Sequence, residues 1–190
     1  YMIFSKSSLF GEWEFAGFQN YIKMFQDSEV WQATANTLLF VFYTVPVGIM
    51  LALILAVLLN SDIKGRTTFR TIYFLPMVVP PAAVALVWKW MFNTEFGIIN
   101  TVLRSIGFPT TNWLTNPSTV MLSCSIVAIW SSIGYDAILL LAGLQQIPHA
   151  YYEAAKIDGA NAVKQFFHIT VPLLSPIMFF VVIMRCMSSL

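Results

Sequence analysis

Long charge-free stretches divide this chain into apolar segments joined by polar connections. No charged residue lies between Glu29 and Asp62, and residues 36–59 are almost wholly apolar. An α-helix rises about 1.5 Å per residue, so about 20 apolar residues cross the roughly 30 Å hydrocarbon core of a bilayer. The pattern therefore predicts a membrane-spanning helix over residues 36–59.

Three further apolar stretches have the length of a membrane span. We predict these spans at about 71–92, 118–144 and 171–190. The second contains Pro76, Pro80 and Pro81. A helix broken by proline is tolerated in a membrane because neighbouring helices satisfy the freed backbone groups. The pattern predicts an all-α polytopic membrane protein whose transmembrane domain covers residues 34–190.

The composition supports a membrane protein. Of the 190 residues, 58% are hydrophobic and 10% are charged, whereas about a quarter of the residues in a soluble domain are charged. This balance excludes a disordered chain and a coiled coil. The net charge of +1 also lacks the basic excess that is typical of nucleic-acid binding, so we expect no nucleic-acid partner.

The basic residues in the connections predict an orientation. The short connection 60–70 carries three of them, whereas the longer connection 93–117 carries only Arg104. The three are Lys64, Arg66 and Arg70. Cytoplasmic loops are enriched in Lys and Arg, which places 60–70 in the cytoplasm. Alternation of the spans then predicts 145–170 inside, and 1–33 and 93–117 outside.

The N-terminal residues 1–33 mix aromatic and charged side chains. They predict an external amphipathic segment on the membrane interface, with an ordinary surface loop as the alternative. Tyr1 is not an initiator methionine, and the chain stops inside an apolar run. We therefore expect the chain to be part of a larger polytopic protein.

A helical hairpin is predicted at residues 148–168. Pro148 suits a first helical turn, and Asp158 followed by Gly159 ends the helix, because Gly adopts the left-handed backbone of a C-terminal cap. Asn161 can then cap a second helix. Small side chains near the turn, at Ala154, Ala155, Gly159 and Ala160, leave a surface that another protein can approach closely. On these residues alone, an interfacial connector and a docking element both remain open.

The hairpin also resembles a known motif. Glu153-Ala154-Ala155, Gly159 and, after nine intervening residues, Ile169-x-Val171-Pro172 resemble the EAA motif of permease subunits in binding-protein-dependent ABC importers. The family usually has Leu where this chain has Val171. Further segments resemble the sugar-uptake branch, which includes permeases for maltose-like sugars and glycerol phosphate esters. These segments are Asn36-Thr37-Leu38, Gly65-Arg66 with Arg70 and Pro76, and Ala142-Gly143-Leu144-Gln145-x-Ile147-Pro148.

The resemblance implies a fragment of a type I ABC importer permease helix bundle in the cytoplasmic (inner) membrane. In that family the hairpin couples the permease to an ATPase subunit. By resemblance, the coupling residues are Glu153, Ala154, Ala155, Asp158 and Gly159. The implied partners are a second permease subunit, two ATP-binding subunits and an extracytoplasmic solute-binding protein. We expect no cofactor in this chain, because it lacks a phosphate-binding loop, and expect ATP and magnesium in the partner subunits.

Two charged residues fall inside predicted spans. Asp136 and Arg185 each cost at least about 2.5–3.5 kcal/mol to insert, so they require a partner or a cavity. They form either a buried ion pair or part of the transport path, where Arg185 would bind solute. The resemblance places Tyr135, Arg185 and Ser189 where relatives contact sugar, although a membrane tyrosine also serves for packing.

Two other functions compete with the importer. A secondary transporter could couple Asp136 and Arg185 to an ion gradient, and a membrane-embedded enzyme could act on lipid-linked sugars. The enzyme is disfavoured because the sequence has no acid/base constellation, and we expect no catalytic residue. His149 and His168 match no metal-binding spacing, so we expect no metal site.

Overall fold

The computed structural model describes residues 5–6, 14–15, 17–61 and 66–189. The chain divides into two compact units, Tyr1–Leu39 and Phe40–Leu190. In the connection 60–70, Lys64 and the side chains of Arg66 and Arg70 lie outside the described residues. The basic side chains that predict the orientation are therefore not among those the structure describes.

The first unit contains two short strands and a short helix. Strand β1 (Ser5–Lys6) pairs antiparallel with β2 (Glu14–Phe15), and helix α1 covers Gln19–Gln26. The exposed side chains of α1 and its flank include both apolar and polar residues. The predicted external segment 1–33 is thus only partly helical in its described residues.

Helix α2 (Ser28–Asn60) begins eight residues before the predicted span at 36–59. The side chain of Asp27 accepts a hydrogen bond from the backbone N–H of Glu29 at 2.9 Å, and this contact satisfies one of the free donors of the first turn. The indole of Trp31 donates to the carbonyl of Phe25 at 2.8 Å. These polar contacts extend the helix beyond its apolar part, which hydropathy alone does not reveal.

The predicted span 71–92 is two helices in the structure. Helix α3 (Arg66–Val78) and helix α4 (Pro81–Met91) meet at an angle of 108°. A residue that precedes proline is disfavoured in the α conformation, so Val79 and Pro80, each followed by a proline, leave the helix. Pro76 remains inside α3. The three prolines of the sequence therefore indicated a broken span, but neither which of them breaks the helix nor how sharp the bend is.

The connection after α4 is organised around one buried asparagine. Helix α5 covers Ile98–Ser105, and its Asn100 is fully buried. The Asn100 amide nitrogen donates to the carbonyls of Thr94 and Thr111, both at 3.0 Å. Its oxygen accepts from the Thr111 backbone at 3.2 Å and from the Trp113 indole at 2.9 Å. All four hydrogen-bonding positions of the side chain are thus used.

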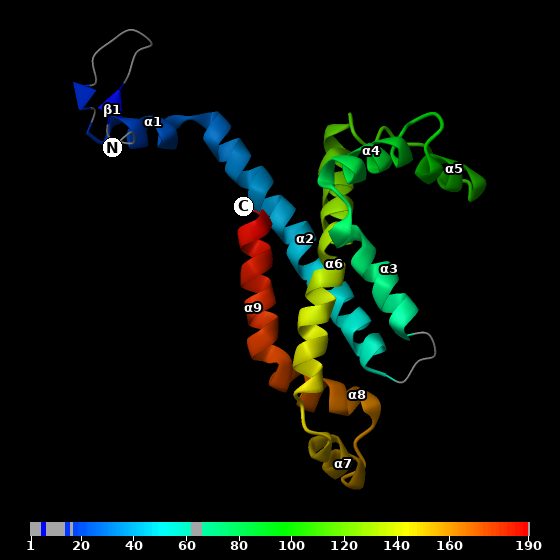
Figure 1. Cartoon of the computed structure of the whole chain (residues 1–190). Coiled ribbons are helices and arrows are strands. Elements are labelled where there is room, and N and C mark those ends of the chain that lie inside the picture. Colours follow the sequence, from blue (N-terminus) through cyan, green and yellow to red (C-terminus); the bar gives the residue numbers. More distant parts are fainter. Residues whose placement is uncertain (1–4, 7–13, 16, 62–65, 190) are drawn as a thin grey trace. The chain divides into compact units, whose positions relative to one another are not determined.

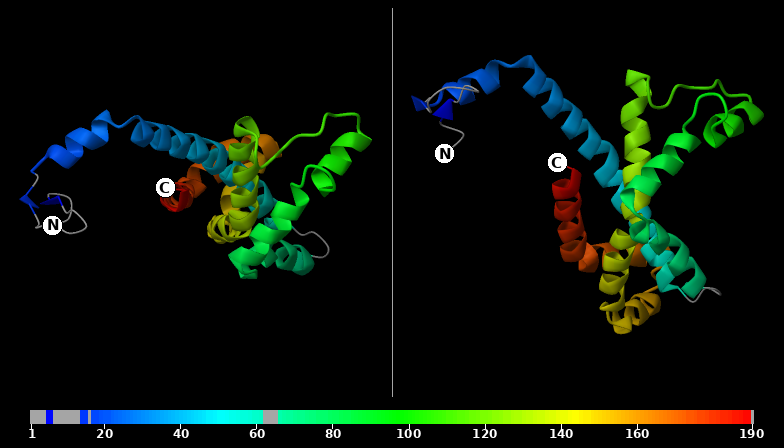
Figure 2. Two further views of the ribbon diagram at one scale, coloured as in Figure 1. Left: turned by 90° about the horizontal axis from the view of Figure 1, so that it is seen from above. Right: turned by 45° about the horizontal axis from the view of Figure 1, so that its top comes forward.

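Helix α6 (Pro117–Gln145) matches the predicted span 118–144 to within one residue. Asn116 caps it by accepting the backbone N–H of Ser118 at 3.0 Å, and Pro117 occupies the first helical position. Figure 1 shows α4 and α5 near the end where α6 begins, with α7 and α8 beyond the end where it stops. The right-hand view in Figure 2 shows the same separation.

The hairpin leads directly into the last span. Helix α7 (His149–Ile157) is followed by α8 (Ala162–Gln165), a π-helical turn η2 (Phe166–Thr170) and α9 (Val171–Ser189). In the π-turn, the N–H of Val171 donates to the carbonyl of Phe166, five residues earlier. Pro172 has no N–H and its ring crowds the preceding turn, so a wider turn at this point relieves the conflict.

The apolar core of the second unit joins α2, α6 and α9. Buried residues recur every three or four positions, which keeps their side chains on one face of each helix. In α2 these are Val45, Ile49, Ala52, Leu55, Ala56 and Leu59. In α6 and α9 they are Ala137, Leu140, Leu141, Leu144, Leu174 and Val181. The same face of each helix extends into the candidate site.

Candidate functional site

A layer of polar and small residues lies between the same three helices. Each helix contributes two residues that are four positions apart and therefore share a face. We call this set the polar layer; it consists of Thr44 and Gly48 in α2, Ser132 and Asp136 in α6, and Arg185 and Ser189 in α9. The structure thus brings Asp136, Arg185 and Ser189 together, as three of the four predicted solute-path residues.

Arg185 and Asp136 form a buried ion pair at the centre of the polar layer. Arg185 Nε lies 2.9 Å from Asp136 Oδ2, and both side chains are almost fully buried. Neither Arg185 Nε nor Asp136 Oδ2 forms a hydrogen bond of good geometry with any described residue, so the Nε–H does not point along this contact. The attraction is therefore mainly between the charges. Of the two interpretations left open by the sequence, the structure contains the ion pair.

Two neutral residues complete the surroundings of Arg185. Its Nη1 donates to the hydroxyl of Ser132, and its Nη2 packs against Gly48, where any β-carbon would overlap the guanidinium. The small residue in α2 therefore makes room for the large cation in α9. Among the described residues, Nη2 has no hydrogen-bond acceptor.

Ser189 links α9 to α2 at the edge of the polar layer. Its hydroxyl lies 3.4 Å from the hydroxyl of Thr44, which itself donates to the carbonyl of Phe40 at 2.8 Å. Since the proton of Thr44 is used, Ser189 acts as the donor in the longer contact. Ser189 is only half-buried, whereas Thr44 is fully buried.

Tyr135 lies apart from the polar layer. It is adjacent in sequence to Asp136, but its side chain is 40% exposed while that of Asp136 is buried. Consecutive residues on a helix point about 100° apart, so the two side chains lie on different faces. The structure therefore places Tyr135 on a different face of α6 from the ion-paired Asp136.

Sequence reasoning did not identify Thr44, Gly48 or Ser132. Ser132 could have been found, because it lies four residues before Asp136 and so shares its face of α6. Gly48 carries a weaker signal, since a glycine in an apolar span often marks a close approach between helices. Which helix approaches it depends on the three-dimensional packing.

The hairpin forms the second part of the candidate site. Helix α7 ends in a Schellman motif: the N–H of Gly159 donates to the Lys156 carbonyl at 3.1 Å, and that of Ala160 to the Ala155 carbonyl at 2.8 Å. Gly159 has φ +77°, in the left-handed region. The predicted helix break at Asp158 and Gly159 is confirmed.

The second helix of the hairpin begins at the predicted cap. The side chain of Asn161 accepts the backbone N–H of Lys164 at 2.9 Å, and Gln165 donates to the carbonyl of Ala160 at 2.8 Å. These bonds hold α8 against the turn. Glu153, Ala154, Asp158 and Gly159 are exposed, and Ala155 is half-buried.

The tip of the hairpin is unusually apolar for an exposed surface. Ile157 is 87% exposed, and Val163 is 63% exposed. Glu153 and Lys156 lie on the same short helix and carry charge next to these apolar groups. A compact tip with an apolar side chain and flanking charges can fill a cleft on another protein and form ion pairs at its rim.

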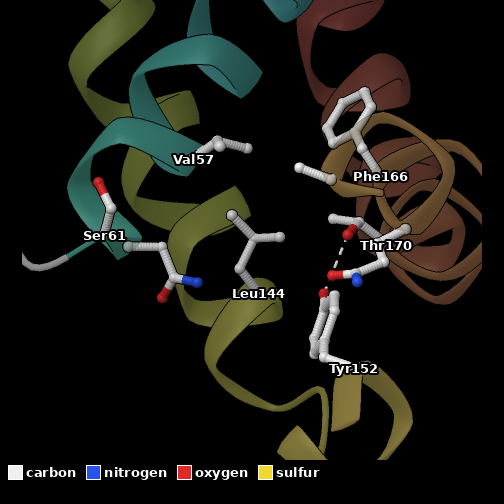
Figure 3. A pocket seen from close by; sticks show the side chains of 9 residues that line it. Val57, Ser61, Leu144, Tyr152, Phe166 and Thr170 are labelled. Atoms are coloured by element: carbon white, nitrogen blue, oxygen red, sulfur yellow. Dashed lines mark hydrogen bonds between the residues drawn. The ribbon is translucent and has the colours of Figure 1, made fainter. Parts of the chain in front are cut away.

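The base of the hairpin is attached to α9 by a pair of hydroxyl groups. Tyr152 Oη lies 2.9 Å from Thr170 Oγ1, and Thr170 is buried. Beside this pair is a cavity of about 260 Å³ whose walls come from the end of α2, the end of α6, the hairpin and η2. Figure 3 shows the hydroxyl pair with Val57, Ser61 and Leu144 around the cavity.

The described geometry defines a class of protein: a polytopic helical membrane protein with a hairpin at one end of its bundle. The family described as binding-protein-dependent transport system inner membrane component matches residues 34–190. The chain belongs to this family. It is therefore a multi-pass inner-membrane protein, and the resemblance carried by the EAA motif is confirmed.

Individual relatives carry names from sugar transport. The chain is 37% identical over 177 residues to the sulfoquinovosyl glycerol transport system permease protein SmoG of Agrobacterium fabrum, covering 93% of this chain and 58% of that protein. It is 37% identical over 176 residues to the trehalose/maltose transport system permease protein MalF of Thermococcus litoralis, covering 93% and 60%. The chain thus spans about three fifths of the length of these relatives.

A solved structure supports the same fold. The chain superposes on a chain of a bacterial alginate ABC transporter, which was crystallised with an alginate pentasaccharide-bound periplasmic protein. The TM-score is 0.80 at 27% sequence identity, covering 89% of this chain and 59% of the other. The predicted type I ABC importer permease fold is therefore confirmed.

Proposed function

We propose that this chain is part of a permease subunit in an ATP-driven importer for a carbohydrate or a related solute. The observation that carries the proposal is the hairpin, whose Schellman turn presents the EAA residues at one end of a membrane-spanning bundle. Family membership and the names of the relatives support the same activity. The chain itself would provide the path through the membrane and would not hydrolyse ATP.

The proposed partners follow from the hairpin and from the family. The hairpin would dock into an ATP-binding subunit, of which the importer has two, each with ATP and magnesium. A second permease subunit would complete the path, and an extracytoplasmic solute-binding protein would deliver the solute. Glu153 would pair with a basic residue of the ATPase. The small residues Ala154, Ala155 and Gly159 would allow the ATPase to approach the hairpin closely, and Asp158 would end its first helix.

The polar layer supports an assignment of the solute-path residues. Tyr135 and Ser189 are partly exposed, so we assign solute contact to them; the ring of Tyr135 suits stacking on a sugar face. Asp136 and Arg185 are buried against each other, so we assign them the task of holding α9 against α6. Arg185 would then influence solute binding through the position of Ser189, four residues further along the same helix.

The test compares hairpin variants in the assembled complex. Glu153→Ala removes the charge that we expect at the ATPase interface, and losing such a pair costs roughly 2–5 kcal/mol. Gly159→Val introduces a β-branched side chain at positive φ and reshapes the turn. Both variants should remain inserted and folded in the full-length permease, but should abolish solute-stimulated ATP hydrolysis in proteoliposomes.

Matched controls lie in the connection between α4 and α6. Gly107 has φ +80° and, like Gly159, has open space where a β-carbon would be placed. Gly107→Val therefore imposes similar backbone strain away from the hairpin, and Glu95→Ala removes an exposed acid there. Both controls should retain stimulated hydrolysis. Normal transport by the two hairpin variants would show that the hairpin is only a connector. Transport driven by an ion gradient without ATP would favour a secondary transporter.

A further inference from the structure

We propose that Tyr152 is a positioning residue for transport, whose hydroxyl bond to Thr170 carries movement of the hairpin into α9. The inference rests on the proposed function, because it assumes that an ATPase subunit moves the hairpin. The residue pair belongs neither to the predicted coupling set nor to the polar layer.

The Tyr152–Thr170 bond links the first helix of the hairpin, α7, to the π-turn η2 that follows its second helix. Tyr152 lies in α7 and Thr170 lies eighteen residues later in η2, at an oxygen–oxygen distance of 2.9 Å. At the other corner, Gln165 in α8 donates to the carbonyl of Ala160 in the turn. Among the side-chain hydrogen bonds of the described residues, the Tyr152–Thr170 pair is the one that joins α7 to η2. A closed loop of this kind fixes the angle between α7 and the helix that follows.

The Tyr152–Thr170 bond ends on the π-helical turn that precedes α9. Thr170 is the last residue of the π-turn Phe166–Thr170, and π-turns are irregular segments where a helix can adjust its pitch. Without the bond, movement of the hairpin could be absorbed by this turn. With the bond, the turn is fixed by a buried contact at its end, and α9 starts at the next residue.

Helix α9 then extends to the polar layer. Arg185 lies fifteen residues after Thr170, which is about 22 Å along a continuous helix. Because Arg185 is held by Asp136 of α6 and packs against Gly48 of α2, a displacement of α9 must change its contacts with both helices. Tyr152 and Thr170 thus stand at the beginning of a helical connection, α9, between the hairpin and the polar layer.

The surroundings of the pair disfavour a direct route from the hairpin to α2. The cavity of about 260 Å³ lies between the end of α2, at Val57, Asn60 and Ser61, and the wall formed by α8 and η2. Figure 3 shows Val57 and Ser61 on one side of this space and Phe166 and Thr170 on the other. The hydroxyl pair therefore provides a specific contact between the hairpin and η2 at this end of the bundle. Among the described residues, no side-chain hydrogen bond joins α2 to the hairpin.

The experiment removes one hydroxyl at a time from the full-length permease in the assembled importer. Tyr152→Phe and Thr170→Val preserve shape, and Thr170→Ser preserves the hydroxyl. A neutral hydrogen bond of ordinary net strength shifts an equilibrium by about fivefold. We therefore expect the first two variants to lower solute imported per ATP hydrolysed by about fivefold, and Thr170→Ser to behave like the natural protein.

Further measurements separate positioning from general damage. Co-purification of the ATPase and its KM for ATP should be unchanged in Tyr152→Phe, because the docking tip is intact. The double variant Tyr152→Phe with Thr170→Val should be no worse than either single variant, since both remove one bond. Tyr43→Phe, an exposed tyrosine of α2, serves as the matched control and should have no effect.

The outcomes distinguish this inference from the proposed function. If Glu153→Ala uncouples the importer while Tyr152→Phe imports as much solute per ATP as the natural protein, the importer function stands and the positioning role is wrong. Equal damage from Thr170→Ser and Thr170→Val would also overturn it. If Glu153→Ala and Gly159→Val both leave transport intact, the hairpin is not the coupling element and both proposals fail.

Discussion

The two buried charges show how single residues are stabilised inside this bundle. An isolated charge at membrane depth is costly, and the cost is reduced when two opposite charges meet. Asp136 and Arg185 do so at 2.9 Å, with Ser132 accepting a further N–H. Removing one partner leaves the other charge without compensation, whereas removing both leaves an apolar contact.

We therefore predict that Arg185→Met destabilises the protein by about 3–5 kcal/mol. The double variant with Asp136→Leu should recover most of the loss, because no unpaired charge remains. Thermal unfolding of the purified full-length permease in detergent measures both. A single variant as stable as the natural protein, with weakened transport or a changed choice of solute, would instead place Arg185 in direct contact with the solute.

Asn100 is the residue on which the connection between α4 and α6 depends. Its side chain satisfies two carbonyls, one backbone N–H and one indole N–H, and it is fully buried. Asn100→Ala leaves these groups without their partner, and a buried unsatisfied group costs about 1–3 kcal/mol.

We expect Asn100→Ala to make residues 93–116 sensitive to protease under conditions in which the natural protein resists cleavage. Asn112→Ala is the control, because Asn112 is an exposed asparagine of the same connection and its side chain has no hydrogen bond among the described residues. Equal resistance of Asn100→Ala and the natural protein would show that the network contributes little.

The sequence predicted the charges of the polar layer but not their surroundings. Asp136 and Arg185 are conspicuous because charges are rare in apolar spans. Their pairing depends on how α6 and α9 pack, which no local pattern contains. The sequence analysis did not single out Asn100, because its burial results from the fold of residues 93–116 around it.

At the scale of elements, prediction succeeded where a single physical signal dominates. Helix α6 begins and ends within one residue of the predicted span, because Asn116 and Pro117 mark its start and the apolar run sets its length. Helix α2 starts earlier than hydropathy predicts, because Asp27 caps a polar first turn. The break between α3 and α4 follows from the consecutive prolines, whereas no local pattern gives its angle of 108°.

Two glycines of α6 allow its neighbours to approach closely, and they differ in what they contact. A β-carbon at Gly134 would overlap the backbone carbonyl of Tyr73 in α3, whereas one at Gly143 would meet flexible side-chain ends of Leu174 and Ile177 in α9. Backbone atoms cannot move aside without shifting a helix, while side chains can change rotamer.

We therefore predict that Gly134→Ala destabilises the protein by about 1–3 kcal/mol. Gly143→Ala should be nearly neutral, because the gain in helix propensity of about 1 kcal/mol offsets the local crowding. Both changes are made in the same helix, so their propensity gains are equal and the difference reports the α3 contact. Thermal unfolding of the two variants measures it, and equal stabilities would contradict the close approach of α3 and α6.

At the scale of the whole second unit, the contacts determine which segments share an end of the bundle. Ser61, at the end of α2, and Leu144, at the end of α6, line the same cavity as Tyr152 of the hairpin. Helix α6 has 29 residues, about 43 Å at the usual rise, so its first residue lies beyond the opposite side of a 30 Å hydrocarbon core. We therefore expect the bent pair α3 and α4 to carry the chain across.

This arrangement predicts opposite exposure of the two connections. In a background with Cys124 and Cys186 replaced by alanine, a single cysteine at Ser61 should react only from the cytoplasmic side, and one at Thr110 only from outside. Thr110 is exposed and leaves the cap residue Asn116 intact. The measurement is labelling by a membrane-impermeant maleimide in intact cells and in inverted vesicles. Labelling of both positions from one side would mean that α3 and α4 form a re-entrant loop, and would overturn the assignment of the hairpin to the cytoplasm.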